Sequence, residues 1–334
     1  MRMKLKLLAV VAVVSILLVV LALQSMDSGR VDDLQSRQLL SEEQLELVNS
    51  LERISLARGQ QRVELARDEQ GVWGVVSQNL FPAQPERVAA LLHALRGARV
   101  LEAKTDNPDY HARLGLDPAE PGEHSLQVNL QAGDQGLAIV YGNQVGSGQL
   151  VRLQDENQVW LINRPFGMTL NDNEWLDLQV AQLPMEQLAT ARWEHADGDV
   201  LALEKPAEGD YNFRLTDLDA ELQQGNERWI NSMVLALVNL RAQAVSLRSE
   251  LDLQEPMLRM QVQSWEGAEL EASLYEVNGR YWLLVDAFEQ PEGSDLTVNA
   301  DQRWAFQLGI GQVESMNKRQ SDIIRSTAGE AETE

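Results

Sequence analysis

The feature that most constrains this chain is an uncharged, apolar run close to its first residue. Leu7 to Leu23 is 17 residues long and contains no charged side chain. At a rise of about 1.5 Å per residue, a helix of this length just crosses a hydrocarbon layer of about 30 Å. We therefore expect a transmembrane anchor over residues 7–23, so that the folded part of the protein is built from the residues after it.

The charges on the two sides of this run predict its direction. Arg2, Lys4 and Lys6 precede it and Asp27 follows it. The positive-inside rule then places residues 1–6 in the cytoplasm and the bulk of the chain outside, in the periplasm of a cell with a bacterial inner membrane. A cleaved secretory signal is the alternative, but its apolar core is usually about 7 to 15 residues long, and no A-x-A-like cleavage site follows Leu21.

The part of the chain after the anchor is strongly acidic. The whole chain has 28 Lys and Arg against 51 Asp and Glu, and without the three leading cations the balance is 25 against 51, a formal charge of −26. Such a surface repels phosphate backbones, which excludes nucleic acid as a partner. The absence of cysteine excludes disulfides, lipid attachment at a lipobox and thiolate metal sites, so stability has to come from the burial of apolar side chains.

The same order of elements occurs twice after the anchor. Each copy begins with two short strands around a glycine-bearing turn and a third strand, followed by a helix with apolar residues at helical spacing. A strand with alternating apolar residues comes next, which is typical of a sheet with one buried face. These elements are expected at residues 51–67, 72–75, 85–96 and 126–130 in the first copy, and at 188–204, 211–214, 227–241 and 258–262 in the second.

This order predicts the α+β class: a transmembrane helix followed by two tandem, internally duplicated α+β domains, each an antiparallel sheet with one main helix. The domains are expected at residues 51–185 and 186–310. Residues 24–50 are either a linker or an amphipathic stalk helix, and the sequence leaves both open. Residues 311–334 are expected to form a helical or disordered acidic tail.

A family resemblance rests on the string Y-x-x-x-L-G-L-D-P from Tyr110 to Pro118 and on the segment from Trp73 to Arg96 before it. Together with Asn173-Glu174-Trp175, these residues resemble the membrane-anchored family called domain of unknown function 4340. The likeness covers residues 50–185 well and the second half weakly. It implies an export-facing, anchored protein that often accompanies gliding-motility-type ABC transporter components, and it supplies no catalytic residues.

Patterns that would carry chemistry are incomplete in this sequence. The glycines around Ser147 lack the frame of a nucleophile elbow or a phosphate loop, and the segment from Asp217 has Leu222 where a calcium loop requires glycine. The four histidines have neither i, i+4 spacing nor an H-E-x-x-H frame: His93, His111, His124 and His195. We therefore expect no catalytic residues, no metal and no cofactor.

Two groups of residues are candidates for binding a partner. The first is the turn of Leu114, Gly115, Leu116, Asp117 and Pro118, because exposed loops often carry function, although turn geometry alone also explains these residues. The second is a set of tryptophans. Trp160, Trp175, Trp282 and Trp304 recur at equivalent places in the two copies and are expected in the core. The better candidates for an aromatic contact surface have no counterpart in the first copy: Trp193, Trp229 and Trp265.

These features favour a non-catalytic, membrane-anchored accessory or scaffold protein that faces the periplasm. On the family resemblance, we expect an auxiliary subunit of an ABC transporter that contacts the permease and the ATPase. Anchoring raises the effective concentration of the domains near other membrane proteins, so that weak contacts suffice. The alternative is an envelope ligand-binding module that captures lipid, glycan or peptide between its two domains. An exported hydrolase is disfavoured, because the sequence lacks a recognisable constellation of nucleophile, base or metal ligands.

Overall fold

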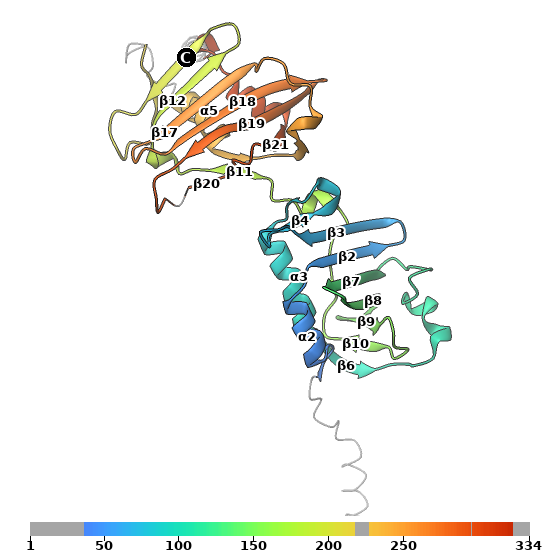
Figure 1. Ribbon diagram of the computed structural model, residues 1–334. Coiled ribbons are helices and arrows are strands. Elements are labelled where there is room, and N and C mark those ends of the chain that lie inside the picture. Colours follow the sequence, from blue (N-terminus) through green and yellow to red (C-terminus); the bar gives the residue numbers. More distant parts are fainter. Residues whose placement is uncertain (1–36, 218–226, 295, 323–334) are drawn as a thin grey trace, which may run out of the picture. The chain divides into compact units, whose positions relative to one another are not determined.

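The computed structural model of the chain describes residues 37–217, 227–294 and 296–322 (Figure 1). Within these residues, most of the regular structure is antiparallel β-sheet. There are 21 strands in three sheets, together with six short 3-10 helices. The α-helices are α2 (Glu42–Asn49), α3 (Pro85–Gly97), α5 (Glu227–Val238) and α6 (Ile310–Met316), and residues 320–322 are also helical.

The predicted α+β class is therefore wrong, because the described part of the chain is mainly antiparallel β-sheet. The two expected main helices do form, as α3 (Pro85–Gly97) and α5 (Glu227–Val238). They are a small part of the regular structure, because the two large sheets have ten and eight strands. Many of these strands are only two to five residues long, too short to show a clear alternation in the sequence. No described helix is both long enough and apolar enough to cross a membrane, and the predicted anchor at residues 7–23 lies outside the described residues.

The contacts within the chain divide it into two compact units. Among the described residues, unit 1 comprises 37–64 and 89–170, and unit 2 comprises 65–88, 171–217, 227–294 and 296–322. The strands β4 (Trp73–Val75) and β5 (Phe81–Pro82) lie among the residues of unit 2.

The first sheet has ten strands in the order β1-β6-β10-β9-β8-β7-β2-β3-β4-β5. Its strands are β1 (Arg37–Gln38), β2 (Arg53–Arg58), β3 (Gln61–Arg67), β4 (Trp73–Val75), β5 (Phe81–Pro82), β6 (Arg99–Ala103), β7 (Leu126–Ala132), β8 (Gln135–Val145), β9 (Gly148–Leu153) and β10 (Trp160–Ile162). Two 3-10 helices, Pro108–Tyr110 and Ala112–Leu114, precede β7, and a third, Val76–Gln78, follows β4.

Residues 37–50, assigned from the sequence to a linker or stalk, lie within unit 1. The helix α2 (Glu42–Asn49) begins after Ser41, whose hydroxyl accepts from the Gln44 amide while the Gln44 side chain accepts from the Ser41 amide. This reciprocal capping box satisfies two amide groups that the first helical turn leaves free. Leu47 and Val48 are buried, and α2 contacts β7 and β8, so this segment forms part of the unit's core.

The second sheet has eight strands in the order β14-β13-β12-β17-β18-β19-β21-β16 and lies in unit 2. Its strands are β12 (Leu188–His195), β13 (Val200–Glu204), β14 (Arg214–Leu215), β16 (Ala244–Leu247), β17 (Leu258–Ser264), β18 (Glu269–Val277), β19 (Arg280–Glu289) and β21 (Trp304–Leu308). A third, small sheet has the order β15-β11-β20, formed by β11 (Gln179–Gln182), β15 (Asn239–Arg241) and β20 (Thr297–Val298). The 3-10 helices of this unit are Asp172–Glu174, Met185–Gln187 and Arg248–Glu250.

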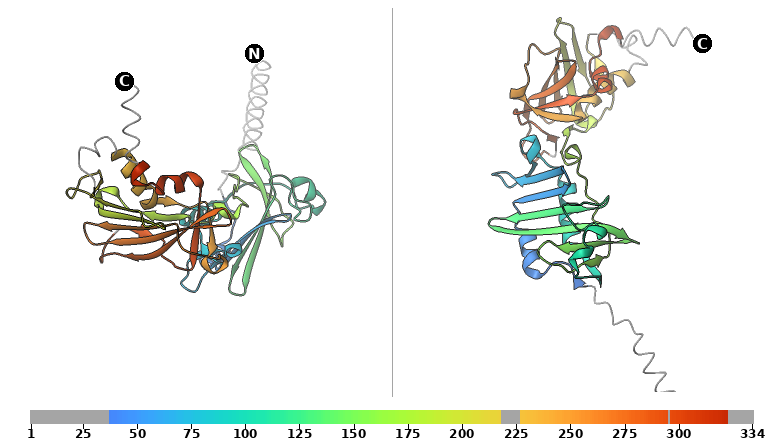
Figure 2. Two further views of the ribbon diagram at one scale, coloured as in Figure 1. Left: turned by 90° about the horizontal axis from the view of Figure 1, so that it is seen from above. Right: turned by 90° about the vertical axis from the view of Figure 1, so that its right-hand side faces the viewer.

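The helices α5 and α6 (Ile310–Met316) lie on one face of the second sheet, which we call its inner face (Figure 2). The alternation predicted for Leu258, Met260 and Val262 is confirmed, because all three are buried while Arg259 between them is exposed. The predicted helix over residues 227–241 ends at Val238, and the next three residues form β15 instead. The strand predicted at residues 211–214 is limited to β14, which starts only at Arg214.

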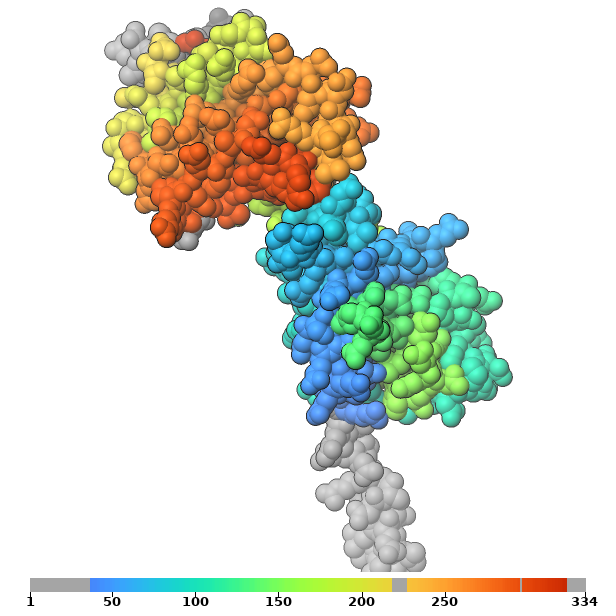
Figure 3. Space-filling view, viewed as in Figure 1, coloured from blue at the N-terminus to red at the C-terminus, as the bar shows by residue number. Residues whose placement is uncertain are grey.

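The outer face of the second sheet, opposite α5, is towards the viewer in Figures 1 and 3. A segment around residue 250 covers one part of it. In that part, Leu251 and Leu253 pack against a buried cluster of Trp282, Leu284 and Ala305. The strands β12, β17 and β18 beside this segment carry exposed polar side chains.

Candidate functional site

The Leu114–Pro118 turn, the first candidate from the sequence, packs against the sheet of unit 1. Gly115 closes the 3-10 helix before it in the left-handed region, at φ 69°, where glycine is favoured. Leu116 is fully buried and packs with three apolar side chains of the unit: Val140, Leu150 and Val159. Because Leu114, Asp117 and Pro118 are only half exposed, the turn is mainly a component of the core.

Arg152 of β9 connects this turn to the next loop. Its side chain is buried, and Nε donates to the Leu116 carbonyl at 3.2 Å. Nη1 donates to the carbonyls of Leu153, Gln154 and Glu156 at 3.4, 2.9 and 3.3 Å. Burial lowers the pKa of Arg152, against the attraction of Asp117, but arginine starts so high that the group stays charged at neutral pH.

The close approach of β8 to the turn predicts a strong effect at Gly142. A Cβ at this position would lie 2.5 Å from the Leu114 carbonyl oxygen and 2.8 Å from the Leu116 side chain. We expect Gly142→Ala to push the turn off the sheet and to lower the free energy of unfolding by about 1 to 3 kcal/mol. Urea unfolding followed by circular dichroism measures this loss.

Gly136→Ala, in the same strand, is the matched control for Gly142→Ala. A Cβ at Gly136 meets no neighbouring atom closer than 3.7 Å, an ordinary contact distance. Its unfolding midpoint should stay unchanged or rise slightly, because alanine restricts the unfolded chain. Equal midpoints for the two variants would show that the turn does not need the space at Gly142.

The three tryptophan candidates differ in their surroundings. Trp193 is fully buried on the inner face of the second sheet, and its indole Nε1 has no hydrogen-bond partner among the described residues. Trp229 at the start of α5 is 43% exposed, and Trp265 after β17 is 38% exposed. The Lys318 ammonium lies 5.3 Å from the centre of the Trp229 ring, within cation–π range. Only Trp229 and Trp265 can therefore contribute to a contact surface.

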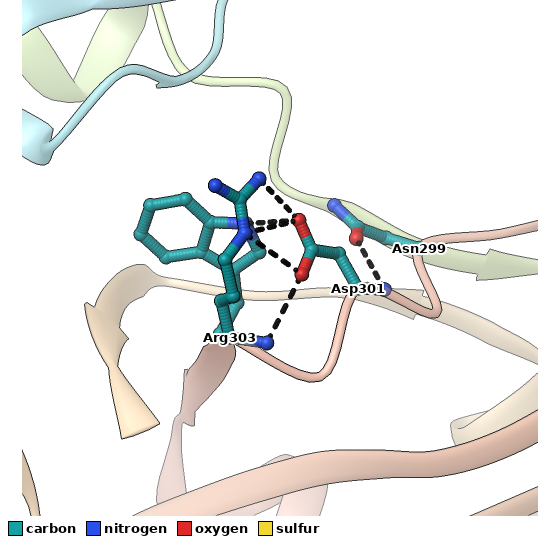
Figure 4. Close-up of polar contacts among 4 residues, drawn as sticks. Asn299, Asp301 and Arg303 are labelled. Atoms are coloured by element: carbon teal, nitrogen blue, oxygen red, sulfur yellow. Dashed lines mark hydrogen bonds and ion pairs between the residues drawn. The ribbon is translucent and has the colours of Figure 1, made fainter. Parts of the chain in front are cut away.

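A polar network around Asp301 orients Trp304 at the start of β21 (Figure 4). The Arg303 side chain donates to the Asp301 carboxylate from Nε at 2.9 Å and from Nη2 at 2.6 Å, and the Trp304 indole donates to Oδ2 at 3.1 Å. Hydrogen bonds from Arg303 hold the pKa of Asp301 below its usual range. The Phe81 ring packs edge-on against the Trp304 ring, with 5.0 Å between the ring centres. These contacts make the network a structural feature of unit 2.

The outer face of the second sheet contains a hollow of about 450 Å³ beside the segment around residue 250. It is lined by side chains of β12, β17, β18 and β19 that point to this face. Guanidinium groups are supplied by Arg192 and Arg259, and carboxylates by Glu194, Glu271 and Asp286. Gln261, Ser273 and Tyr275 complete the polar lining.

Cross-strand register brings these side chains together. Arg192 of β12 is opposite Gln261 of β17, and Glu194 is opposite Arg259. On the other side of β17, Gln261 is opposite Glu271. These residues are therefore neighbours on one face, although Arg192 and Asp286 are 94 positions apart in the sequence. Sequence reasoning missed this site because its carboxylates and arginines look dispersed along the chain.

Hydrogen bonds order part of the floor of the hollow. The buried Ser273 hydroxyl donates to Asp286 Oδ2 at 2.5 Å. The Gln261 side-chain amide donates to Glu269 and, at 3.5 Å, to Glu271. The Arg259 guanidinium has no hydrogen bond or ion pair within the described part of the chain, so its donors point to solvent and are free to bind.

A metal site requires several histidine or carboxylate side chains that converge on one point. No group of three or more His, Cys, Asp or Glu side chains within residues 37–217, 227–294 and 296–322 has a suitable arrangement. His111 and His195 are buried, and their Nε2 atoms lie 3.0 and 3.1 Å from the carbonyl oxygens of Asn157 and Lys318. Both histidines therefore have a structural partner.

The fold and this surface define an antiparallel β protein of two units, one of which carries an open hollow of mixed charge on its sheet. A family model described as Domain of unknown function (DUF4340) matches residues 73–256, which is 184 of the 334 residues, and the chain belongs to this family. The resemblance inferred from the Tyr110–Pro118 string is thereby confirmed, and the match extends past residue 185 into the second half. No curated protein and no solved structure matches the chain.

Proposed function

We propose that this protein is a non-catalytic accessory or scaffold protein, attached to a bacterial inner membrane by the Leu7–Leu23 segment, with its two β units in the periplasm. Its partners would be the permease and ATPase of an ABC transporter, and its mechanism would be positioning. The apolar run and the three cations before it support the membrane attachment and its direction. The membership of the family supports the choice of partners by association alone.

The observation that carries this proposal is the exposed surface around Trp229 in unit 2. Lys318, which lies over the Trp229 ring, also borders a second hollow of about 410 Å³. Met257, Ile310 and Val313 contribute apolar side chains to it, and Ile310 is 65% exposed. Glu314, Asn317 and Asp322 complete the lining of this hollow with polar groups. An exposed tryptophan beside a hollow with both apolar and polar side chains is a typical anchor of a protein interface, because its large rigid surface is desolvated on binding. We call these residues the Trp229 surface.

The test is affinity purification of the full-length protein from mildly solubilised membranes of its own cells. We expect the permease and ATPase of a transporter in the eluate, and we expect both to be lost from a chain that lacks residues 1–24 and is exported by another signal. Recovery of no transporter subunit with the full-length protein would contradict the proposal.

Substitution of the exposed tryptophans locates the contact. Trp229→Ala should weaken binding about thirtyfold, since an interface anchor contributes about 2 kcal/mol or more. Trp265→Ala tests the second exposed tryptophan separately. Tyr211→Ala is the matched control, because Tyr211 is a 54% exposed aromatic residue of the same unit outside the Trp229 surface. Equal recovery of partners with the Trp229 and Tyr211 variants would exclude the Trp229 surface as the contact.

A further inference from the structure

The hollow on the outer face of the second sheet is separate from the Trp229 surface, and its chemistry points to a ligand of its own. Its lining includes two guanidinium groups and three carboxylates, so the formal charges sum to 2 − 3 = −1. Guanidinium groups only donate hydrogen bonds and ionised carboxylates only accept them. Groups that only donate therefore lie next to groups that only accept on adjacent strands. An example is Arg259 of β17, which is opposite Glu194 of β12.

This lining discriminates between classes of ligand. Three carboxylates repel phosphate and sulfate groups, and two guanidinium groups repel polyamines. An apolar ligand would strip water from these charges without replacing the hydrogen bonds, which is costly. A ligand with many hydroxyl groups meets neither difficulty, because each hydroxyl both donates and accepts and can bridge a guanidinium and a carboxylate.

We infer that this hollow binds a neutral carbohydrate. Arg259 and Gln261 of β17 would bind sugar hydroxyls from the floor, with Glu271 and Asp286 as acceptors beside them. Tyr275 is half-buried, packs against the cluster around Trp282 and borders the hollow, so its ring is held in place to contact the apolar face of a sugar. The volume of about 450 Å³ falls within the range of small-molecule sites, roughly 300 to 1,000 Å³.

The preformed hydrogen bonds support a binding site in preference to an ordinary solvated surface. Ser273 fixes the Asp286 carboxylate, and the contacts of Gln261 with Glu269 and Glu271 fix its amide. Polar groups that are ordered before binding lose less conformational entropy when a ligand arrives. Arg259 keeps its donors unused, which leaves the strongest donor of the floor for the ligand.

The experiment is isothermal titration of the full-length protein, solubilised in detergent without a sugar headgroup, with neutral oligosaccharides. Chitotetraose and maltotetraose are the two probes, one N-acetylated and one built from glucose alone, so that their comparison identifies the sugar class. A sulfated oligosaccharide is the charged probe. We expect saturable binding of at least one neutral probe and none of the sulfated one.

Three substitutions, two in the hollow and one matched control, connect binding to the hollow. Gln261→Ala should weaken binding of the neutral probe about tenfold, and Arg259→Ala should weaken it by at least as much. Gln263→Ala should leave it unchanged, because Gln263 is the same residue type on the same strand and face but does not line the hollow.

Several outcomes would overturn this inference. They are the absence of binding by both neutral probes, preferential binding of the sulfated probe, and equal effects of the Gln261 and Gln263 substitutions. Partner capture through the Trp229 surface is measured separately by affinity purification, so the failure of one proposal is distinguishable from the failure of the other.

Discussion

Replacement of Arg152 by methionine is expected to lower the free energy of unfolding by about 3 kcal/mol. The guanidinium binds the carbonyls of Leu116, Leu153, Gln154 and Glu156 from a buried position, and methionine preserves much of the side-chain length but none of the donors. The four carbonyls would then lose their charged partner in a site with little access to water. Urea unfolding monitored by far-UV circular dichroism measures the loss.

Two further substitutions separate the charge of Arg152 from its geometry. Arg152→Lys keeps the positive charge, but all of its N–H donors are on one nitrogen atom. We therefore expect this variant to be more stable than Arg152→Met and less stable than the unaltered chain. Arg53→Met is the control, because Arg53 is an exposed arginine on β2 of the same sheet. A loss of stability for Arg152→Met no larger than that for Arg53→Met would show that the buried hydrogen bonds contribute little.

The second large effect is expected for Phe81→Ala, with a loss of about 3 to 5 kcal/mol in the free energy of unfolding. Phe81 is fully buried, and its ring meets Trp304 at 5.0 Å and Phe306 at 6.3 Å between centres, both edge-on. Its removal would leave a cavity in unit 2 and would also lose two aromatic contacts.

The backbone before Phe81 adds to this expectation. Asn79 and Leu80 have φ values of 55° and 60°, a left-handed conformation that costs on the order of 1 kcal/mol or more for a residue such as leucine. A Cβ at Gly74 would lie only 2.5 Å from the Leu80 carbonyl oxygen, so the chain is tightly folded back at this corner. Burial of the Phe81 ring offsets these costs.

Phe81→Leu is the control for the alanine substitution. Leucine retains much of the apolar volume, so we expect a loss of less than about 1.5 kcal/mol. Both variants are compared with the unaltered chain by urea unfolding. Equal losses for leucine and alanine would assign the effect to the aromatic contacts instead of the cavity, and no loss for alanine would contradict the proposed role of Phe81.

The sequence predicted the elements whose periodicity is long and local. The helix expected at residues 85–96 forms as α3, Pro85–Gly97, and the helix expected from Glu227 begins there as α5. The end of α5 was predicted three residues late, because Leu240 continues the apolar pattern but is buried in β15. Tertiary pairing with β11 overrides the helical spacing there.

The candidate sites were less predictable from sequence. Leu116 lies in a turn that sequence reasoning offered for partner binding, yet it is buried by packing with Val140 and Leu150 from strands that come later in the chain. Trp193 and Trp229 belong to the same unit. Trp193 on β12 faces the buried side of the second sheet, whereas Trp229 on α5 is exposed. The hollow itself depends on strands β12, β17, β18 and β19 lying side by side.

The sequence by itself determined the acidic charge, the absence of cysteine chemistry, the apolar run at Leu7–Leu23, the two main helices and the family, because these are properties of composition or of neighbouring residues. Only the tertiary structure decided the predominance of antiparallel sheet, the burial of Leu116 and Trp193, and the meeting of Arg192, Arg259 and Asp286 in one hollow. The physical reason is that strand order and register are set by packing between distant segments, and a shift of one residue moves every side chain of a strand to the opposite face.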